Sequence, residues 1–230
     1  MPPHLDPSSP PRVPKHWWLL PLAIAVLPFV VTHLALLLSI EAGNVPGCVP
    51  YLTGCTSISR AARHGLANDL FQLVMVPVAV LHALNWALAR RWFASSHASA
   101  GGGASLLPLG LIAGAALAVY AVALGTEGDF YRWMRRFGIT FYFGCTYLAQ
   151  LVFVRRLGQI ERPPRIEQRA MSAIAMVLLA MGIASVAASA TVTDDALKDA
   201  IENVLEWNLA LLMTVWFLLQ ARLWRRLSRG

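Results

Sequence analysis

Titratable side chains occur inside several otherwise apolar stretches of this 230-residue chain. His33, Asp69 and Tyr120 lie in three of these stretches, and Glu202 and Glu206 lie four residues apart at the start of another. Residues four apart on a helix share one face, so the two glutamates point to the same side. Polar groups in membrane-spanning segments cost free energy, and their presence indicates either a functional site or structural pairing.

A second concentration of chemically active groups is the segment CVPYLTGCTSISRAARHG, residues 48–65. It holds two cysteines, a Ser/Thr cluster, two arginines and a histidine, which is more chemistry than a connector between adjacent helices needs. The segment is either a folded cap or a part of a site. Cys48 and Cys55 form a disulfide, which an oxidising exterior favours, or remain two thiols. Two cysteines alone supply too few ligands for zinc, and no metal or cofactor motif is present.

These groups predict a polar chamber that opens outward between membrane helices and takes a lipid headgroup or acts on its ester. Their depth along the helices is similar, and a partly desolvated carboxylate is suited to proton transfer. The candidates for general base or proton carrier are Glu206, Asp69 and His33. The candidates for substrate contact, proton transfer or nucleophilic attack are Ser57, Ser59, Arg60, His64, Tyr120, Asp129 and Glu202.

The structural alternative is that Glu206 and Asp69 pair with Arg60, Arg63 or Arg132 and simply fix the loops in place. No nucleophile elbow or other established catalytic motif decides between these hypotheses. His82 and Asn85 lie deeper in the second apolar stretch and are not predicted to join the chamber. Cys145 is interpreted as a small buried apolar residue.

Membrane helices must position these residues, because the composition is that of a polytopic membrane protein. Hydrophobic residues make up 57% of the chain and charged residues 13%, compared with about 25% charged residues in soluble domains. A run of about 20 apolar residues crosses the hydrocarbon core as a helix. Six spans are predicted at residues 17–40, 66–89, 106–125, 137–157, 170–191 and 203–222. The predicted fold is an all-α bundle of six transmembrane helices.

The charge distribution predicts the orientation of the bundle and the limits of its tails. With a cytoplasmic N-terminus, 13 of the 19 Lys and Arg residues lie on the cytoplasmic side, in agreement with the positive-inside rule. Residues 1–16 are then a disordered proline-rich cytoplasmic tail, residues 17–224 the transmembrane domain and residues 225–230 a basic cytoplasmic tail. Both termini are cytoplasmic and segment 48–65 lies outside.

The expected partners are membrane lipids. The net charge of +7 is interpreted as an attraction of the basic loops, and of the segment RLWRRLSR after the last span, to anionic inner-leaflet headgroups. No aromatic-basic motif for nucleic acid is present. In the fifth span, the spacing of Ala180, Ala184 and Ala188 indicates close helix packing.

Three motifs carry a resemblance to a known family. They are the first-loop segment CVPYLTGCTSISRAARHG with its Thr56-Ser57-Ile58-Ser59 core, the segment GDFYRWMRRFGITFYF, and the final helix ENVLEWNLALLMTVWF with Glu206-Trp207. Their order and the six-span count resemble the family that joins the FGF-receptor-activating protein, the damage-regulated autophagy modulators (DRAM), the post-GPI-attachment remodelling factors, and the Sfk-type and Cwh-type proteins.

The resemblance implies a lipid-linked role at the exoplasmic face, such as remodelling of lipid acyl chains. Relatives often have proline where Thr56 stands, and many have a histidine in the region of Arg132. The Ala/Arg-rich composition suggests a bacterial inner membrane, where a substrate other than a GPI anchor is needed. The alternative function is a non-enzymatic scaffold or regulator of membrane lipid organisation.

Overall fold

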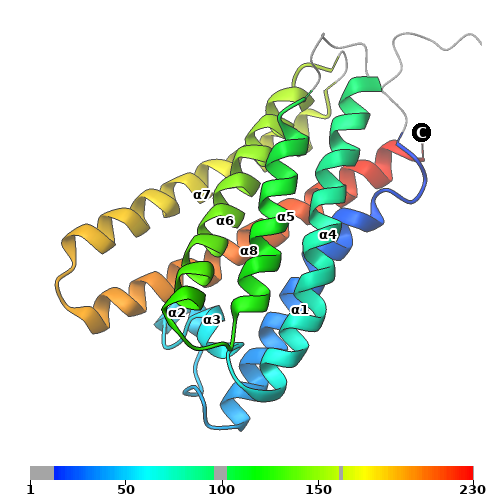
Figure 1. The fold of residues 1–230 in the computed structure, drawn as a ribbon. Coiled ribbons are helices and arrows are strands. Elements are labelled where there is room, and N and C mark those ends of the chain that lie inside the picture. The colour runs from blue at the N-terminus through cyan, green and yellow to red at the C-terminus, as the bar shows by residue number, and fades with distance from the viewer. Residues whose placement is uncertain (1–12, 96–102, 161–162, 230) are drawn as a thin grey trace, which may run out of the picture.

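The computed structural model describes residues 13–95, 103–160 and 163–229 (Figure 1). Within these ranges all regular elements are helices, and six are long and apolar enough to cross a membrane. The six are α1 (Leu19–Glu41), α4 (Gly65–Ser95), α5 (Leu106–Ala123), α6 (Asp129–Leu157), α7 (Arg165–Thr191) and α8 (Asp195–Leu227). Two short helices, α2 (Pro50–Thr53) and α3 (Ile58–Ala61), follow α1. The predicted all-α bundle of six membrane helices is confirmed.

Several helices extend beyond the predicted spans. α6 begins at Asp129 instead of residue 137, and α8 runs from Asp195 to Leu227 instead of 203–222. The added turns are amphipathic: the first turns of α6 carry arginines beside the exposed aromatic rings of Phe130 and Trp133. Hydropathy alone ends a span at such charges, whereas the backbone continues to hydrogen-bond as a helix. Arg225 and Arg226, which belong to the predicted basic tail, are therefore helical.

The helices pack in the order of the chain, with α5 between α4 and α6. α1 packs against α4 and α8, and α7 packs mainly against α8. Figure 1 shows the α7–α8 hairpin leaning away from α4, α5 and α6 toward the end of the bundle that holds α2 and α3. We call this the capped end, and we call the opposite end, where α1 begins and α8 finishes, the tail end.

Small residues bring α4, α5 and α6 into close contact. Gly110 of α5 lies against Trp86 of α4, where a Cβ atom would collide with the indole side chain. One turn on, a Cβ at Gly114 would lie 2.7 Å from the carbonyl oxygen of Ala79. This Gly-xxx-Gly spacing is the pattern by which membrane helices approach backbone to backbone. Gly138 of α6 packs in the same way against α5.

Two clusters of buried side chains form the core, one near each end. The capped-end cluster includes Phe71, Leu117 and Trp207, and the tail-end cluster is built from large aromatic rings such as Trp86 and Trp216. Residues 1–12 of the predicted tail, and residues 96–102 between α4 and α5, lie outside the described residues. Val13, which belongs to the predicted disordered tail, is buried in the tail-end cluster.

Candidate functional site

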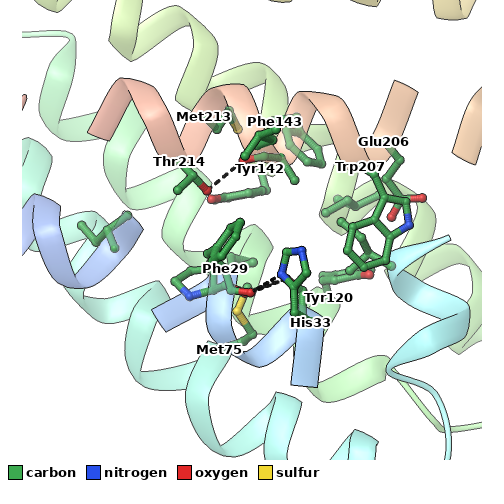
Figure 2. Close-up of a pocket in the computed structure, with 18 of the residues that line it drawn as sticks. Phe29, His33, Met75, Tyr120, Tyr142, Phe143, Glu206, Trp207, Met213 and Thr214 are labelled. Carbon is green, nitrogen blue, oxygen red and sulfur yellow. Dashed lines mark hydrogen bonds between the residues drawn. The ribbon is translucent and has the colours of Figure 1, made fainter. Parts of the chain in front are cut away.

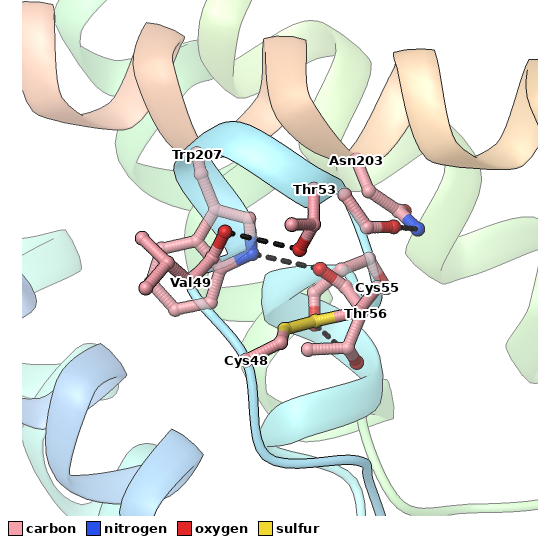
Figure 3. The surroundings of a disulfide bond; sticks show 9 residues. Cys48, Val49, Thr53, Cys55, Thr56, Asn203 and Trp207 are labelled. Carbon is pink, nitrogen blue, oxygen red and sulfur yellow. Dashed lines mark hydrogen bonds between the residues drawn. A yellow bond between two sulfur atoms is a disulfide. The ribbon is translucent and has the colours of Figure 1, made fainter.

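The segment between α1 and α4 folds into a cap over the bundle (Figure 3). Cys48 and Cys55 are joined by a disulfide, which is the first of the two alternatives for these cysteines. Three side chains of α8 donate to backbone carbonyl oxygens of this loop, and Asn208 does so to Tyr51 at 3.0 Å. The indole N–H of Trp207 donates to the carbonyl oxygen of Thr56 at 2.9 Å, and the amide of Asn203 donates to that of Gly54 at 2.8 Å. The cap is therefore fixed to the last helix of the chain.

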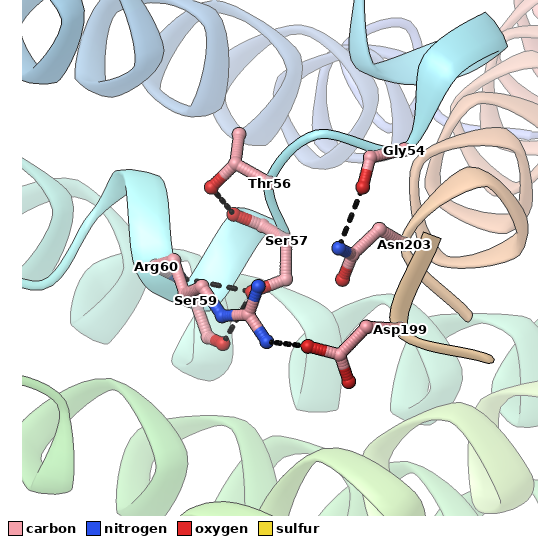
Figure 4. A network of polar contacts seen from close by, with 7 residues as sticks. All are labelled: Gly54, Thr56, Ser57, Ser59, Arg60, Asp199 and Asn203. Atoms are coloured by element: carbon pink, nitrogen blue, oxygen red, sulfur yellow. Dashed lines mark hydrogen bonds and ion pairs between the residues drawn. The ribbon is translucent and has the colours of Figure 1, made fainter. Parts of the chain in front are cut away.

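The serines of the cap form hydrogen bonds within the cap itself (Figure 4). The Ser57 hydroxyl caps α3 by accepting the backbone N–H of Arg60 at 3.1 Å, and it lies 3.1 Å from the Ser59 hydroxyl. An N-cap serine of this kind typically stabilises a helix by about 1 kcal/mol. Arg60 forms an exposed ion pair with Asp199 of α8. Ser57 and Arg60 therefore have structural partners, and neither lines the two cavities described next.

A narrow cavity of about 70 Å³ lies below the cap, between α1, α4, α5, α6 and α8 (Figure 2). Its walls are mainly apolar and aromatic, with Phe29, Met75 and Trp207 among them. The polar groups that reach it come from several helices, and they include His33 of α1, Tyr120 of α5 and Glu206 of α8. Pro28 in the same wall lacks a backbone N–H, which leaves the carbonyl of Ile24 without its helical donor.

His33 belongs to a hydrogen-bonded chain that starts at the backbone of α1. Its Nδ1 lies 2.6 Å from the carbonyl oxygen of Phe29, and the Tyr51 hydroxyl lies 2.9 Å from its Nε2. A carbonyl oxygen can only accept, so Nδ1 carries a proton, and in the neutral ring Nε2 accepts from Tyr51. Burial raises the pKa of the Tyr51 phenol, which keeps it protonated as the donor.

A larger cavity of about 590 Å³ lies beside the first, between α6 and the α7–α8 hairpin. Four arginines line it: Arg63 before α4, and Arg132, Arg135 and Arg136 on the first turns of α6. Glu202 and Glu206 of α8 face them from the other wall, and the deeper part is apolar. Glu202 accepts a hydrogen bond from Ser189 of α7.

Glu206 and Tyr120 belong to the wall that the two cavities share. The Glu206 carboxylate lies beside the first turn of α3, near the backbone amides of Ile58 and Ser59. The Ser59 side chain lies near the Tyr120 phenol in the lining of the larger cavity. A carboxylate, a phenol and a hydroxyl from three separate elements thus meet at one place.

The structure brings together some of the predicted site residues. Those that line one or both cavities are His33, Ser59, Tyr120, Glu202 and Glu206. Asp69 does not: it is exposed on α4, which corrects the prediction that it faces the same cavity as Glu206. A carboxylate near the start of a helix can reach water at the membrane surface. Asp69 lies there, so its side chain does not need a polar cavity inside the bundle.

Two further predicted contacts also lie away from the cavities. His64 is exposed just before α4, and Asp129 is exposed in the first turn of α6, where it pairs with Arg132 at 3.4 Å. An acidic residue in the first turn of a helix is stabilised by the helix dipole, which gives Asp129 a local structural role. The alternative in which Glu206 and Asp69 pair with the arginines is not observed within the described ranges, since Arg60 and Arg132 pair with other carboxylates.

Sequence reasoning missed most of the cavity arginines as site residues. From the sequence, Arg63 and Arg132 are predicted only as structural partners, and a fourth span that begins at residue 137 leaves Arg135 and Arg136 in the preceding loop. Positions 132, 135 and 136 have the spacing that places residues on one helical face. Extending the helix back to Asp129 would have found this basic face.

A separate polar group lies deeper in the bundle, and we call it the polar core. It consists of His82 and Asn85 of α4, Thr146 and Gln150 of α6, and Gln220 of α8, all fully buried. Thr146 lies 3.1 Å from Nε2 of His82, and Asn85 donates to Gln220 at 3.2 Å. As predicted, His82 and Asn85 line neither cavity.

Among the residues that the structure describes, no cluster of three or more His, Cys, Asp or Glu side chains could hold a metal ion. No protein-family model, curated protein or solved structure matches this chain. The chemistry of the cavities is therefore the basis for a functional proposal.

Proposed function

We propose that this multi-pass membrane protein handles a membrane lipid at the capped end, in the outer leaflet. The single observation that carries the proposal is the shared wall, where Glu206 and Tyr120 stand between an apolar cavity and a wider polar one. A lipid has a polar headgroup and apolar chains, so a site for it needs a polar region beside an apolar one. Polar groups converging in a concave, largely apolar setting are the usual features of a small-molecule site.

The chemistry of the shared wall supports acyl remodelling as the reaction class. Glu206 is a proton acceptor within a cavity wall, and the hydroxyls of Ser59 and Tyr120 lie close to it. The resemblance of the first-loop and last-helix motifs to the DRAM and post-GPI-attachment remodelling family points the same way. The charge bias supports an orientation with the capped end outside and both termini cytoplasmic. The Ala/Arg-rich composition supports a bacterial inner membrane as the location.

A second candidate function is a scaffold or regulator of membrane lipid organisation without catalysis. The observation that favours it is the engagement of the cap: Ser57 caps α3, Arg60 pairs with Asp199, and Trp207 holds Thr56. In this case the first-loop motif maintains a rigid surface, and the cavity holds a lipid without acting on it.

The test compares the wild-type chain with Glu206→Gln and a control, Asp69→Asn, which removes an exposed carboxylate at the same end. Each protein is purified in mild detergent, and co-purified lipids are quantified by mass spectrometry. Each is then incubated with a phospholipid carrying an isotope-labelled acyl chain. We expect bound lipid in the wild type and in Asp69→Asn, and its loss or its altered turnover in Glu206→Gln. Bound but unchanged lipid in the wild type favours the scaffold. No bound lipid and no turnover contradicts both.

A further inference from the structure

The larger cavity has an excess of positive charge. It is lined by four arginines and only two carboxylates, Glu202 and Glu206. Glu202 accepts a hydrogen bond from Ser189 of α7, and Glu206 lies beside the amide groups at the start of α3. Neither forms an ion pair with a cavity arginine in the described part of the chain.

The cavity arginines differ in how far their hydrogen-bonding capacity is used. Arg135 donates to the backbone carbonyl oxygens of Ala123 and Thr126, at 3.0 and 2.6 Å, and so ties the end of α5 to α6. The Arg63 side chain lines the cavity and forms no hydrogen bond or ion pair with the described residues; its Nε is buried, so its terminal N–H groups are the ones that an anion can reach. Arg136 is exposed to the cavity and forms no ion pair within those residues. Two guanidinium groups thus remain available to an anion.

The arginines also act on one another. Arg135 experiences the like charges of Arg63 and Arg132, and the phenol of Tyr120 lies within the field of both Arg63 and Arg135. Like charges brought together in a partly desolvated cavity are unfavourable until an anion neutralises them. Guanidinium groups suit phosphate in particular, because their planar donors match its oxygen atoms in pairs.

The floor of the cavity is apolar. Ile139 and Phe143 of α6 face Leu205 and Leu209 of α8. Free phosphate has no use for such a surface, whereas the glycerol and first acyl carbons of a lipid would bury apolar area against it. The basic rim therefore suits the phosphate of a phospholipid, and the apolar floor suits its acyl chains.

We infer that the larger cavity binds the phosphate group of an anionic phospholipid, with Arg63 and Arg136 as its main ligands. This inference deepens the proposed function and rests on it, since it names the class of lipid. Arg135 positions the rim by joining α5 and α6, and Arg132 adds to the positive field. The phosphate lies on the α6 side, away from Glu206, which leaves the carboxylate near the ester region of the lipid.

The experiment measures binding of phosphatidylglycerol and phosphatidylcholine that carry the same fluorescent acyl chain, by titration of the full-length chain in uncharged detergent. We expect phosphatidylglycerol to bind at least tenfold more tightly, and its affinity to fall with salt. The double variant Arg63→Gln/Arg136→Gln should lose at least tenfold of this affinity. The control Arg90→Gln/Arg91→Gln removes two exposed charges at the tail end and should stay within twofold. Arg136→Gln alone, at an exposed position, serves if the double variant does not fold.

The outcomes separate this inference from the function that it rests on. Equal binding of the two lipids, unchanged in the double variant, overturns the phosphate site while lipid handling stands. An equal loss in the control pair also overturns it. A third titration uses inorganic phosphate as competitor. Displacement of the lipid only at high phosphate concentration supports a lipid ligand. Phosphate binding without binding of either lipid overturns both the inference and the proposed function.

Discussion

The cavities at the capped end and the polar core are both polar sites inside an apolar bundle, but they are built from different groups. The capped end uses charges: arginines and glutamates whose side chains border open cavities. The polar core uses neutral groups, chiefly the amides of Asn85, Gln150 and Gln220, at positions with no exposed surface. Charge is retained where water or a ligand reaches it, because an ion without either costs several kcal/mol.

The two regions also differ in how fully their groups are satisfied. At the cap, the carbonyl oxygens of Gly54 and Thr56 each have a side-chain donor from α8. In the polar core, neither amide atom of Gln150 has a hydrogen-bond partner among the described residues. The cap is therefore held by specific hydrogen bonds, whereas the polar core joins its helices through weaker and incomplete hydrogen bonds.

The largest expected effect comes from placing a carboxylate in each region. Gln150→Glu adds a charge at a wholly buried position without a cation, and we expect a loss of about 3–5 kcal/mol of stability. Thr140→Glu adds the same charge beside the cavity arginines, where we expect a change under about 1 kcal/mol. Thermal unfolding in detergent measures both. Equal losses in the two variants would show that the regions do not differ in their tolerance of charge.

A smaller effect tests how tightly the cap sits on α8. Gly54 has φ +62° and a Cβ there would collide with the backbone of Ala200, whereas Gly43 has φ +72° and open space around it. Gly43→Ala should cost about 1–2 kcal/mol for the left-handed backbone alone. Gly54→Ala carries the same cost and the collision, so we expect about 3 kcal/mol or more. The comparison is made by chemical denaturation, and similar values for both would mean that the cap yields easily.

Double-mutant cycles compare one polar pair from each region. The buried pair Asn85–Gln220 should show a coupling of about 0.6–1.7 kcal/mol, as interhelical hydrogen bonds do in membranes. The Arg60–Asp199 pair, whose side chains are 45% and 55% exposed, should show about 1 kcal/mol or less. Added salt should weaken only the second coupling. A salt-sensitive Asn85–Gln220 coupling would argue against the closed nature of the polar core.

The smallest effect concerns Tyr51, which joins the cap to His33. Because the pKa of Tyr51 is raised in the folded state, its contribution is fully present below about pH 10 and is lost as the pH rises through the folded pKa. Tyr51→Phe should cost about 1 kcal/mol at neutral pH through loss of the hydrogen bond. Its stability should then depend less on pH above 10 than that of the wild type. Unfolding measured at pH 7 and pH 11 checks this. If the stabilities of the two proteins changed in parallel with pH, Tyr51 would not be a hydrogen-bond donor to His33.

The sequence was sufficient for the bundle and for part of the site. A carboxylate at Glu206, well inside an apolar helix, had to find polar neighbours, and so its place in a cavity wall could be predicted. Asp69 lies near the start of α4, where exposure is cheap, and its direction depends on how α4 is turned against α5. The amides of Gln150 and Gln220 are neutral and isolated in apolar runs, so hydropathy gave no signal for the polar core.

The bonds that hold the cap can form only in a certain order during synthesis. The disulfide of the cap closes over only seven residues, whereas the carbonyl oxygens of Gly54 and Thr56 bond to α8 across 149 and 151 residues. At a synthesis rate of roughly 5–20 residues per second, the loop is made about 7–30 s before those donors. During that interval the covalent ring, the Ser57 cap of α3 and the Tyr51–His33 hydrogen bond are constraints of the cap that need no later part of the chain. The ring thus helps to keep the part of the cap that α8 later contacts in its folded shape before α8 has been synthesised.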